Sequence, residues 1–107
     1  MKIDILTTFP EMLVPVIESS IARIAAEKGI VYIEPHDIRS FSENKHGKTD
    51  DYPFGGGDGM VMTPQPLFSG IRHCLDKEKP EKPRIIFPTP DGVPFSQDLA
   101  EDLALEP

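Results

Sequence analysis

The sequence predicts an α/β fold, an open parallel sheet with flanking helices. Short apolar runs suited to strands alternate with stretches in which apolar residues recur every three or four positions. Their order is strand, helix, strand, long loop, helix, strand, helix. Such alternation is typical of parallel strands joined by right-handed crossovers. With 107 residues, the chain has room for one domain at most.

The first half of the chain predicts a strand, a helix and a second strand. Isoleucines alternate with polar residues over 2–7, which favours a strand. A helix follows from Pro10, and Pro15 should kink it or delay its regular part. Gly29 should end it, and alternation over 30–33 indicates the second strand. The expected inner face of the helix consists of Leu13, Val16, Ile17, Ile21 and Ile24.

The second half begins with a long segment that has little periodic pattern. Residues 35–63 read as a loop, and a loop of this length inside a small domain is usually functional or disordered. A helix is predicted over 64–78 and a short buried strand over 84–87. A turn-rich loop spans 88–94, and Ser96 should cap a last helix. The inner faces of these two helices should carry Leu67, Ile71, Cys74, Leu75, Leu99 and Leu103.

Composition narrows the class of protein. Hydrophobic residues make up 38% and charged residues 27%, and the net charge is −7. This acidity argues against a free-standing nucleic-acid binder, yet it allows an enzyme that touches RNA through a local basic patch. No apolar run approaches the roughly 20 residues of a membrane span, so no membrane partner is expected. Asp4 comes too early for a secretion signal, and we therefore predict a cytoplasmic protein.

The cysteine and histidines give no sign of a metal site. Cys74 is the only cysteine, so this chain holds no internal disulfide and no cysteine metal cluster. We expect Cys74 to pack on a helix. His36 and His73 stand alone in the sequence, and no pair of histidines has metal-ligand spacing. The sequence therefore predicts no metal.

A glycine-rich segment is the first candidate for chemistry. Four glycines within five residues, Gly55–Gly59, allow a close approach of the backbone to a ligand, and their amides can form an anion nest. The spacing matches neither a P-loop nor a dinucleotide fingerprint. A small basic cluster suited to a phosphate precedes the glycines, namely Lys45, His46 and Lys48. Asp50 and Asp51 could accept hydrogen bonds from a base edge. The alternative is a mobile glycine linker with solvated charges.

The segment after the predicted strand at 84–87 is the second candidate. In open α/β sheets, ligands bind beyond the carboxyl ends of the strands. Thr89 and the backbone around it could therefore face a small molecule. The competing interpretation is a turn stiffened by Pro88 and Pro90.

Three segments of the chain resemble the tRNA (guanine-N1)-methyltransferase family. They are Ile3–Met12, Lys45–Met60 and Thr89–Gly92, and the resemblance runs from end to end. The family belongs to the SPOUT class, whose α/β domain ends in a trefoil knot. The resemblance implies that residues 1–107 are the N-terminal part of such an S-adenosylmethionine-binding domain, truncated at its C-terminal end. The knot-forming segment is expected beyond Pro107.

The resemblance also implies an activity and its partners. S-adenosyl-L-methionine would donate a methyl group to N1 of the guanine just 3′ of the tRNA anticodon. A homodimer would hold the active site at its subunit interface. Beside the cofactor, the resemblance places Phe87, Pro88, Thr89 and Pro90. Near the guanine and the interface, it places Asp50, Gly55, Gly56, Gly57, Asp58 and Gly59.

The chain departs from the family pattern at two points. The family often has proline or a small residue where Asp58 stands, and leucine-serine-proline where this chain has Pro88-Thr89-Pro90. Threonine keeps the hydroxyl, but Pro88 removes a backbone donor. No catalytic residue is expected within the chain. The family's general base, an aspartate, and its supporting arginine are expected beyond Pro107.

Two other functions stay open from the residues alone. One is a complete small α/β module that holds a phosphate or nucleotide at Gly55–Gly59 and catalyses nothing. The other is an interaction domain that dimerises through the long loop.

Overall fold

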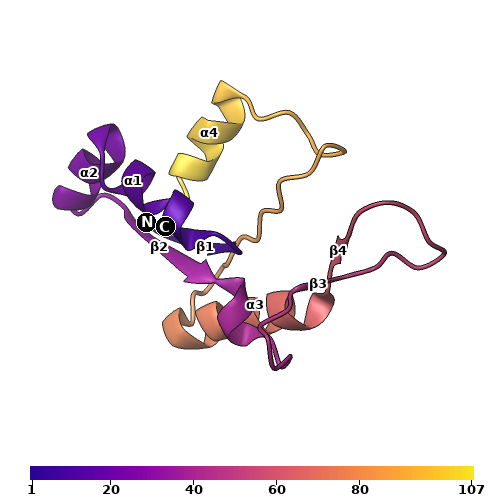
Figure 1. Ribbon diagram of the computed structural model, residues 1–107. Helices are drawn as coiled ribbons and strands as arrows, with labels where there is room; N and C mark the ends of the chain where they lie inside the picture. The colour runs from indigo at the N-terminus through magenta and orange to yellow at the C-terminus, as the bar shows by residue number, and fades with distance from the viewer.

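The computed structural model describes all residues, 1–107 (Figure 1). In chain order the elements are β1 (Lys2–Thr7), the 3₁₀ turn η1 (Pro10–Met12), α1 (Val14–Ile17), α2 (Ser20–Glu27), β2 (Tyr32–Asp37), the 3₁₀ turn η2 (Ile38–Phe41), β3 (Asp50–Asp51), β4 (Val61–Met62), α3 (Pro64–Glu78) and α4 (Gln97–Ala104).

A two-stranded parallel sheet lies at the centre of the first half. β1 pairs with β2 in register from Lys2↔Tyr32 to Thr7↔Asp37. Figure 1 shows α1 and α2 on one side of this sheet and α3 on the other. The predicted alternation of parallel strands and helices is therefore confirmed for this part of the chain.

The close packing of α3 depends on a glycine. A Cβ atom built on Gly70 would lie 2.9 Å from Leu6 Cδ2 and 3.2 Å from Phe41 Cδ2. Gln65 adds a polar link, because its side-chain amide donates a hydrogen bond to the carbonyl of Phe41 at 2.7 Å. This junction of β1, η2 and α3 is the centre of the small core. The buried residues are Ile38, Thr49, Pro66 and Gly70.

The predicted single helix from Pro10 is broken into three pieces. Pro15 lies in the first turn of α1, where its missing N–H costs nothing. The chain then breaks at Ser19 before α2 begins. Because the break rotates α2, the expected apolar face is not continuous, and Val16 and Ile21 are 64% and 80% exposed. Gly29, at φ +68°, follows α2 as predicted.

The segment predicted as an unbroken loop holds several short elements. β2 runs on to Asp37, whose carboxylate accepts a hydrogen bond from Arg39 N at 2.9 Å and caps η2. Farther on, β3 and β4 pair antiparallel, with Asp50 opposite Met62. Elements of two to four residues are too short to leave a periodic signal in the sequence.

The predicted strand at 84–87 is wrong. This segment has no partner strand, and Ile85, Ile86 and Phe87 are 63%, 61% and 70% exposed. A strand needs a neighbouring backbone to satisfy its N–H and C=O groups, and nothing pairs with this run. The turn at 90–91 therefore does not follow a sheet strand, contrary to expectation.

The last helix begins as predicted. Ser96 Oγ accepts a hydrogen bond from Leu99 N at 3.2 Å. An ion pair of 2.6 Å between Arg84 and Glu106 links the two ends of this C-terminal segment. The radius of gyration is 15.9 Å, against about 13 Å for a compact domain of this length, so the chain is less compact than a typical domain of its size. None of the helices has the length and apolar character that crossing a membrane requires.

Candidate functional site

A polar cavity of about 540 Å³ lies between η2 and β3. No hydrophobic residue lines it. Its walls are formed by Arg39, Asn44, His46, Gly47, Lys48, Thr49 and Asp50. The cavity thus unites two residues of the predicted basic cluster with the predicted substrate residue Asp50, and it adds Arg39 and Asn44, which the sequence did not single out.

A tight turn shapes one wall of the cavity. Asn44 Oδ1 accepts a hydrogen bond from His46 N at 2.9 Å, and the carbonyl of Asn44 accepts one from Gly47 N at 3.0 Å. Gly47 has φ +64°, a conformation that favours glycine. Ser42 Oγ closes the segment by donating to the carbonyl of Lys48 at 2.6 Å. Local hydrogen bonds therefore place the cationic side chains around one space.

Asp50 is held in the cavity by the start of the β3–β4 pair. The carbonyl of its neighbour Thr49 accepts hydrogen bonds from Thr63 N at 2.8 Å and Thr63 Oγ1 at 3.1 Å. Asp50 is half-buried and is the only acid among the lining residues. Asp51 differs, because its side chain is 66% exposed and lies 3.8 Å from Lys48 Nζ. The two neighbouring aspartates are therefore not equivalent.

The glycine segment lies apart from this cavity. Residues 52–60 connect β3 to β4 and extend away from the rest of the molecule (Figure 1). Gly55, Gly56, Gly57 and Gly59 have φ values of +84°, +85°, +116° and +85°, and a Cβ on any of them would meet nothing within 4 Å. Asp58 is exposed with them. The backbone is thus open to a ligand, but within this chain no other element covers it.

The predicted cofactor residues form an exposed turn. Phe87, Pro88, Thr89 and Pro90 are all exposed, and none of them lines the polar cavity. Gly92 N donates to the carbonyl of Thr89 at 3.1 Å and closes the turn. The two prolines carry no N–H, so within Pro88–Pro90 the donors are the backbone N–H and the hydroxyl of Thr89. Within this chain these residues enclose no site.

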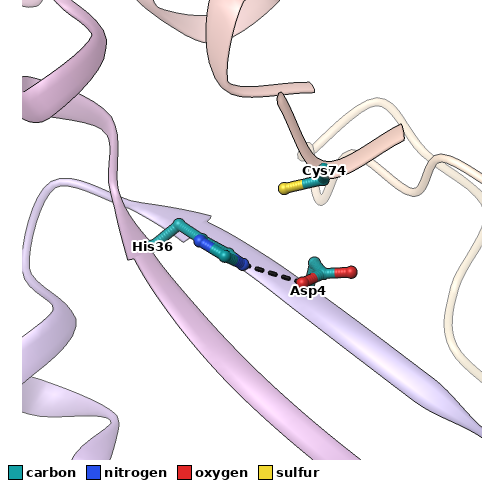
Figure 2. A group of neighbouring side chains, drawn as sticks. All are labelled: Asp4, His36 and Cys74. Carbon is teal, nitrogen blue, oxygen red and sulfur yellow. Dashed lines mark hydrogen bonds and ion pairs between the residues drawn. The ribbon is translucent and has the colours of Figure 1, made fainter. Parts of the chain in front are cut away.

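A second group of polar side chains lies between the sheet and α3. Asp4 of β1, His36 of β2 and Cys74 of α3 meet there, and one donor atom from each lies within 4.8 Å of the others (Figure 2). His36 Nε2 is 2.7 Å from Asp4 Oδ1. Each of the three is a lone residue in the sequence, so no spacing signal could have revealed the group.

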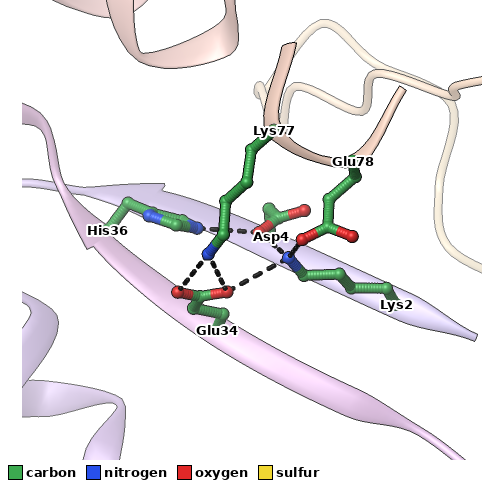
Figure 3. A network of polar contacts seen from close by, with 6 residues as sticks. All are labelled: Lys2, Asp4, Glu34, His36, Lys77 and Glu78. Carbon is green, nitrogen blue, oxygen red and sulfur yellow. Dashed lines mark hydrogen bonds and ion pairs between the residues drawn. The ribbon is translucent and has the colours of Figure 1, made fainter. Parts of the chain in front are cut away.

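An ion-pair network continues from this group along the same face (Figure 3). Lys2 Nζ contacts Glu78, Glu34 Oε2 at 3.1 Å and Asp4 Oδ1 at 3.4 Å. Lys77 Nζ contacts both oxygens of Glu34 at 3.1 and 3.2 Å. The face of the sheet beneath α3 is therefore held largely by charges.

These contacts shift three pKa values. The carboxylate of Glu78, with those of Glu34 and Asp4, raises the pKa of Lys2 above its usual range. Hydrogen bonds from Lys2 and then Lys77 lower the pKa of Glu34 below its ordinary value. Burial, with the charge of Asp4, raises the pKa of the Cys74 thiol above its ordinary value.

The lowered pKa of Glu34 predicts an acid-sensitive fold. Its carboxylate stabilises the native state above the ordinary pKa of 4.5. That contribution is lost as the pH falls through the lower native value, because the unfolded chain then binds the proton more readily. We expect Glu34→Gln to reduce the fall in melting temperature between pH 6 and pH 3. Glu11→Gln, at an exposed site without an ion pair, is the control. Equal acid profiles for wild type and Glu34→Gln would contradict this assignment.

Comparison with known proteins identifies the family. The family model described as tRNA (Guanine-1)-methyltransferase TrmD matches residues 1–107, which is every residue of the chain. The chain belongs to this family. The predicted resemblance to tRNA (guanine-N1)-methyltransferases is therefore confirmed.

Individual relatives of this TrmD-family chain agree with that assignment. It is 43% identical over 106 residues to the tRNA (guanine-N(1)-)-methyltransferase of Clostridioides difficile, covering 99% of this chain and 46% of the relative. The Brevibacillus brevis protein of the same name is 52% identical over 106 residues, with coverage of 99% and 42%. The chain thus spans less than half of the length of these relatives.

A solved structure supports the fold of the TrmD-family chain. The crystal structure of tRNA (m1G37) methyltransferase from Aquifex aeolicus matches with a TM-score of 0.88 and 30% sequence identity. The match covers 99% of this chain and 47% of the Aquifex chain. It confirms the predicted α/β class with a parallel sheet, as in part of a SPOUT methyltransferase.

Proposed function

We propose that the protein transfers a methyl group from S-adenosyl-L-methionine to N1 of the guanine 3′ of the anticodon in tRNA. The observation that carries this proposal is the family match over every residue of the chain. The names of the relatives state the same reaction class. Because the chain covers less than half of each relative, the activity is proposed for the whole protein that contains it.

The polar cavity supports an RNA substrate. Arg39 and Lys48 are among its lining residues, with the Arg39 guanidinium 4.9 Å from the Phe9 ring and Lys48 Nζ 3.8 Å from Asp51, although the chain as a whole has a net charge of −7. A local basic site suits a phosphate, and it positions the RNA without reading its sequence. Asp50 offers a carboxylate in the same cavity, and a carboxylate can accept hydrogen bonds from the N1–H and amino group of guanine. The RNA backbone and the guanine base could thus be held next to each other.

The chemistry sets the roles that must be filled. S-adenosylmethionine, when bound, supplies an electrophilic methyl group. N1 of guanine carries a proton near neutral pH, so a base must accept that proton as the methyl moves. Negative charge then grows on the base oxygen and needs a cation nearby. We assign Asp50 to binding and orienting the guanine, and we place the general base and the supporting arginine outside residues 1–107.

The two loops have roles in the same proposal. Phe87–Pro90 would form one wall of the cofactor site, with the Thr89 hydroxyl as a hydrogen-bond donor. Gly55–Gly59 would approach the guanine at the interface of a homodimer. The exposure of this glycine loop, and the absence of any covering element within the chain, support a role for a second surface there. Since tRNA is the substrate, we place the protein in the cytoplasm.

A methylation assay on the full-length protein tests the function. Purified protein is mixed with labelled S-adenosylmethionine and a tRNA transcript, and nuclease digests are analysed by mass spectrometry. We expect 1-methylguanosine at the position 3′ of the anticodon and no product when that guanine is changed to adenine. Residues 1–107 alone should be inactive. Methylation at another site, or stabilisation by phosphate without any methyl transfer, would overturn the proposal and favour a binding module.

Replacement of Thr89 tests the cofactor wall. Thr89→Val removes the hydroxyl and keeps the shape, so we expect S-adenosylmethionine to bind the full-length protein roughly tenfold more weakly, in line with the loss of one hydrogen bond. Thr89→Ser, which keeps the hydroxyl, should bind as the wild type does. Calorimetric titration with the cofactor measures both. If Thr89→Val and the wild type bind S-adenosylmethionine with equal affinity, the Thr89 hydroxyl does not contact the cofactor.

A further inference from the structure

We propose that Asp4, His36 and Cys74 form a zinc site between the sheet and α3. Nothing in the methyl-transfer reaction uses these residues, and they lie away from the polar cavity described above. The three side chains come from β1, β2 and α3 and converge on one place (Figure 2). A bound ion would thus tie the two strands of the sheet, β1 and β2, to α3.

The donor set selects the metal. A thiolate, an imidazole and a carboxylate are the three ligand types that Zn²⁺ binds in proteins, whereas Mg²⁺ and Ca²⁺ take oxygen ligands only. Three protein ligands leave the fourth tetrahedral position for water. Charge also balances, since one thiolate and one carboxylate neutralise a divalent ion. The thiol proton leaves to solvent as the Cys74 sulfur binds the ion.

The present geometry is close to that of a zinc site. All three donor atoms lie within 4.8 Å of one another, and His36 Nε2 is 2.7 Å from Asp4 Oδ1. Donors on tetrahedral zinc are roughly 3.3–3.7 Å apart, given bond lengths of about 2.0–2.3 Å. The two donor atoms of His36 and Asp4 would move apart by about 0.6 Å, and the sulfur would move in by up to about 1.5 Å. The ion replaces the hydrogen bond that now joins His36 and Asp4, and the neutral imidazole then binds through Nε2 with its proton on Nδ1.

The neighbouring ion pairs let Asp4 change partner. Lys2 contacts Asp4 at 3.4 Å, but it also contacts Glu34 and Glu78. Lys2 therefore keeps two carboxylates when Asp4 turns to a metal. Lys77 holds Glu34 in place at the same time. His73 is one residue before Cys74, but its ring packs 5.3 Å from the ring of Phe41, and we leave it outside the ligand set.

The test uses the full-length protein, freed of metal by a chelator, and ZnCl₂ as the probe. Calorimetric titration should show Zn²⁺ binding, and the ion should protect Cys74 from alkylation, which peptide mass spectrometry localises to that residue. Cys74→Ser and Asp4→Asn should each weaken binding at least about 100-fold, because even changes outside the ligand shell cost roughly 10–100-fold. Glu11→Gln removes a carboxylate at an exposed site without an ion pair and should leave the affinity unchanged.

Two results would overturn the proposal. One is that wild-type protein binds no Zn²⁺ at micromolar concentration, or that bound Zn²⁺ leaves Cys74 fully open to alkylation. The other is that Cys74→Ser and Asp4→Asn retain wild-type affinity. Because the wild-type protection experiment needs no substitution, a variant that fails to fold does not decide the outcome. Neither measurement depends on methyl transfer, so the zinc site and the proposed function stand or fall separately.

Discussion

Asp50→Asn is expected to lower kcat/KM for methyl transfer by about 100-fold or more. Loss of one well-placed polar group at a reacting centre typically costs that much. Asp50 is half-buried in the cavity with the cations Arg39 and Lys48, and it is the only acid there. Asparagine keeps the shape of the side chain but has an NH₂ donor in place of one acceptor oxygen. That donor would face the N–H groups of guanine. Steady-state kinetics with a tRNA transcript measure the effect in the full-length protein.

The neighbouring aspartate provides a matched control. Asp51→Asn makes the same chemical change one residue along, at a side chain that is 66% exposed and only loosely paired with Lys48. Its kcat/KM should stay within about threefold of wild type, as expected for a surface ion pair of small energy. Equal losses in the two variants would show a general charge effect on RNA binding, and the specific role of Asp50 would be refuted.

Gly70→Leu is expected to lower the free energy of unfolding by about 3 kcal/mol, at the upper end of the range for overpacked cores. A Cβ at this position would already lie 2.9 Å from Leu6 and 3.2 Å from Phe41. A leucine would therefore push α3 off β1 and η2. Urea unfolding of the full-length protein, followed by circular dichroism, measures the change.

Gly70→Ala separates the steric effect from the backbone effect. The nearest atom, Leu6 Cδ2, is the end of a flexible side chain and can shift by a few tenths of an ångström. Alanine also favours a helix by about 1 kcal/mol over glycine. These opposing effects should leave the free energy of unfolding of Gly70→Ala much closer to the wild-type value than that of Gly70→Leu. Similar stability for Gly70→Leu and wild type would show that the junction is not closely packed.

The candidate site was only partly predictable. Two residues of the basic cluster, His46 and Lys48, are near Asp50 in the sequence, so a local turn could bring them together, and it does. Arg39 was missed because η2, a four-residue turn, leaves no periodic signal. The glycine segment was singled out correctly as open backbone, but its distance from the cavity depends on the β3–β4 pair that lifts it away.

The sequence by itself determined the α/β class, the family and the local signals that begin and end helices, such as Ser96 and Gly29. These features depend on residues that are neighbours along the chain, and their order can be read directly from the sequence. Only the tertiary structure decided whether Ile85 and Ile86 pair in a sheet, and it left them exposed because no strand lies beside them. It alone also brought Asp4, His36 and Cys74 together, because a parallel pairing and a helix crossing place distant residues side by side.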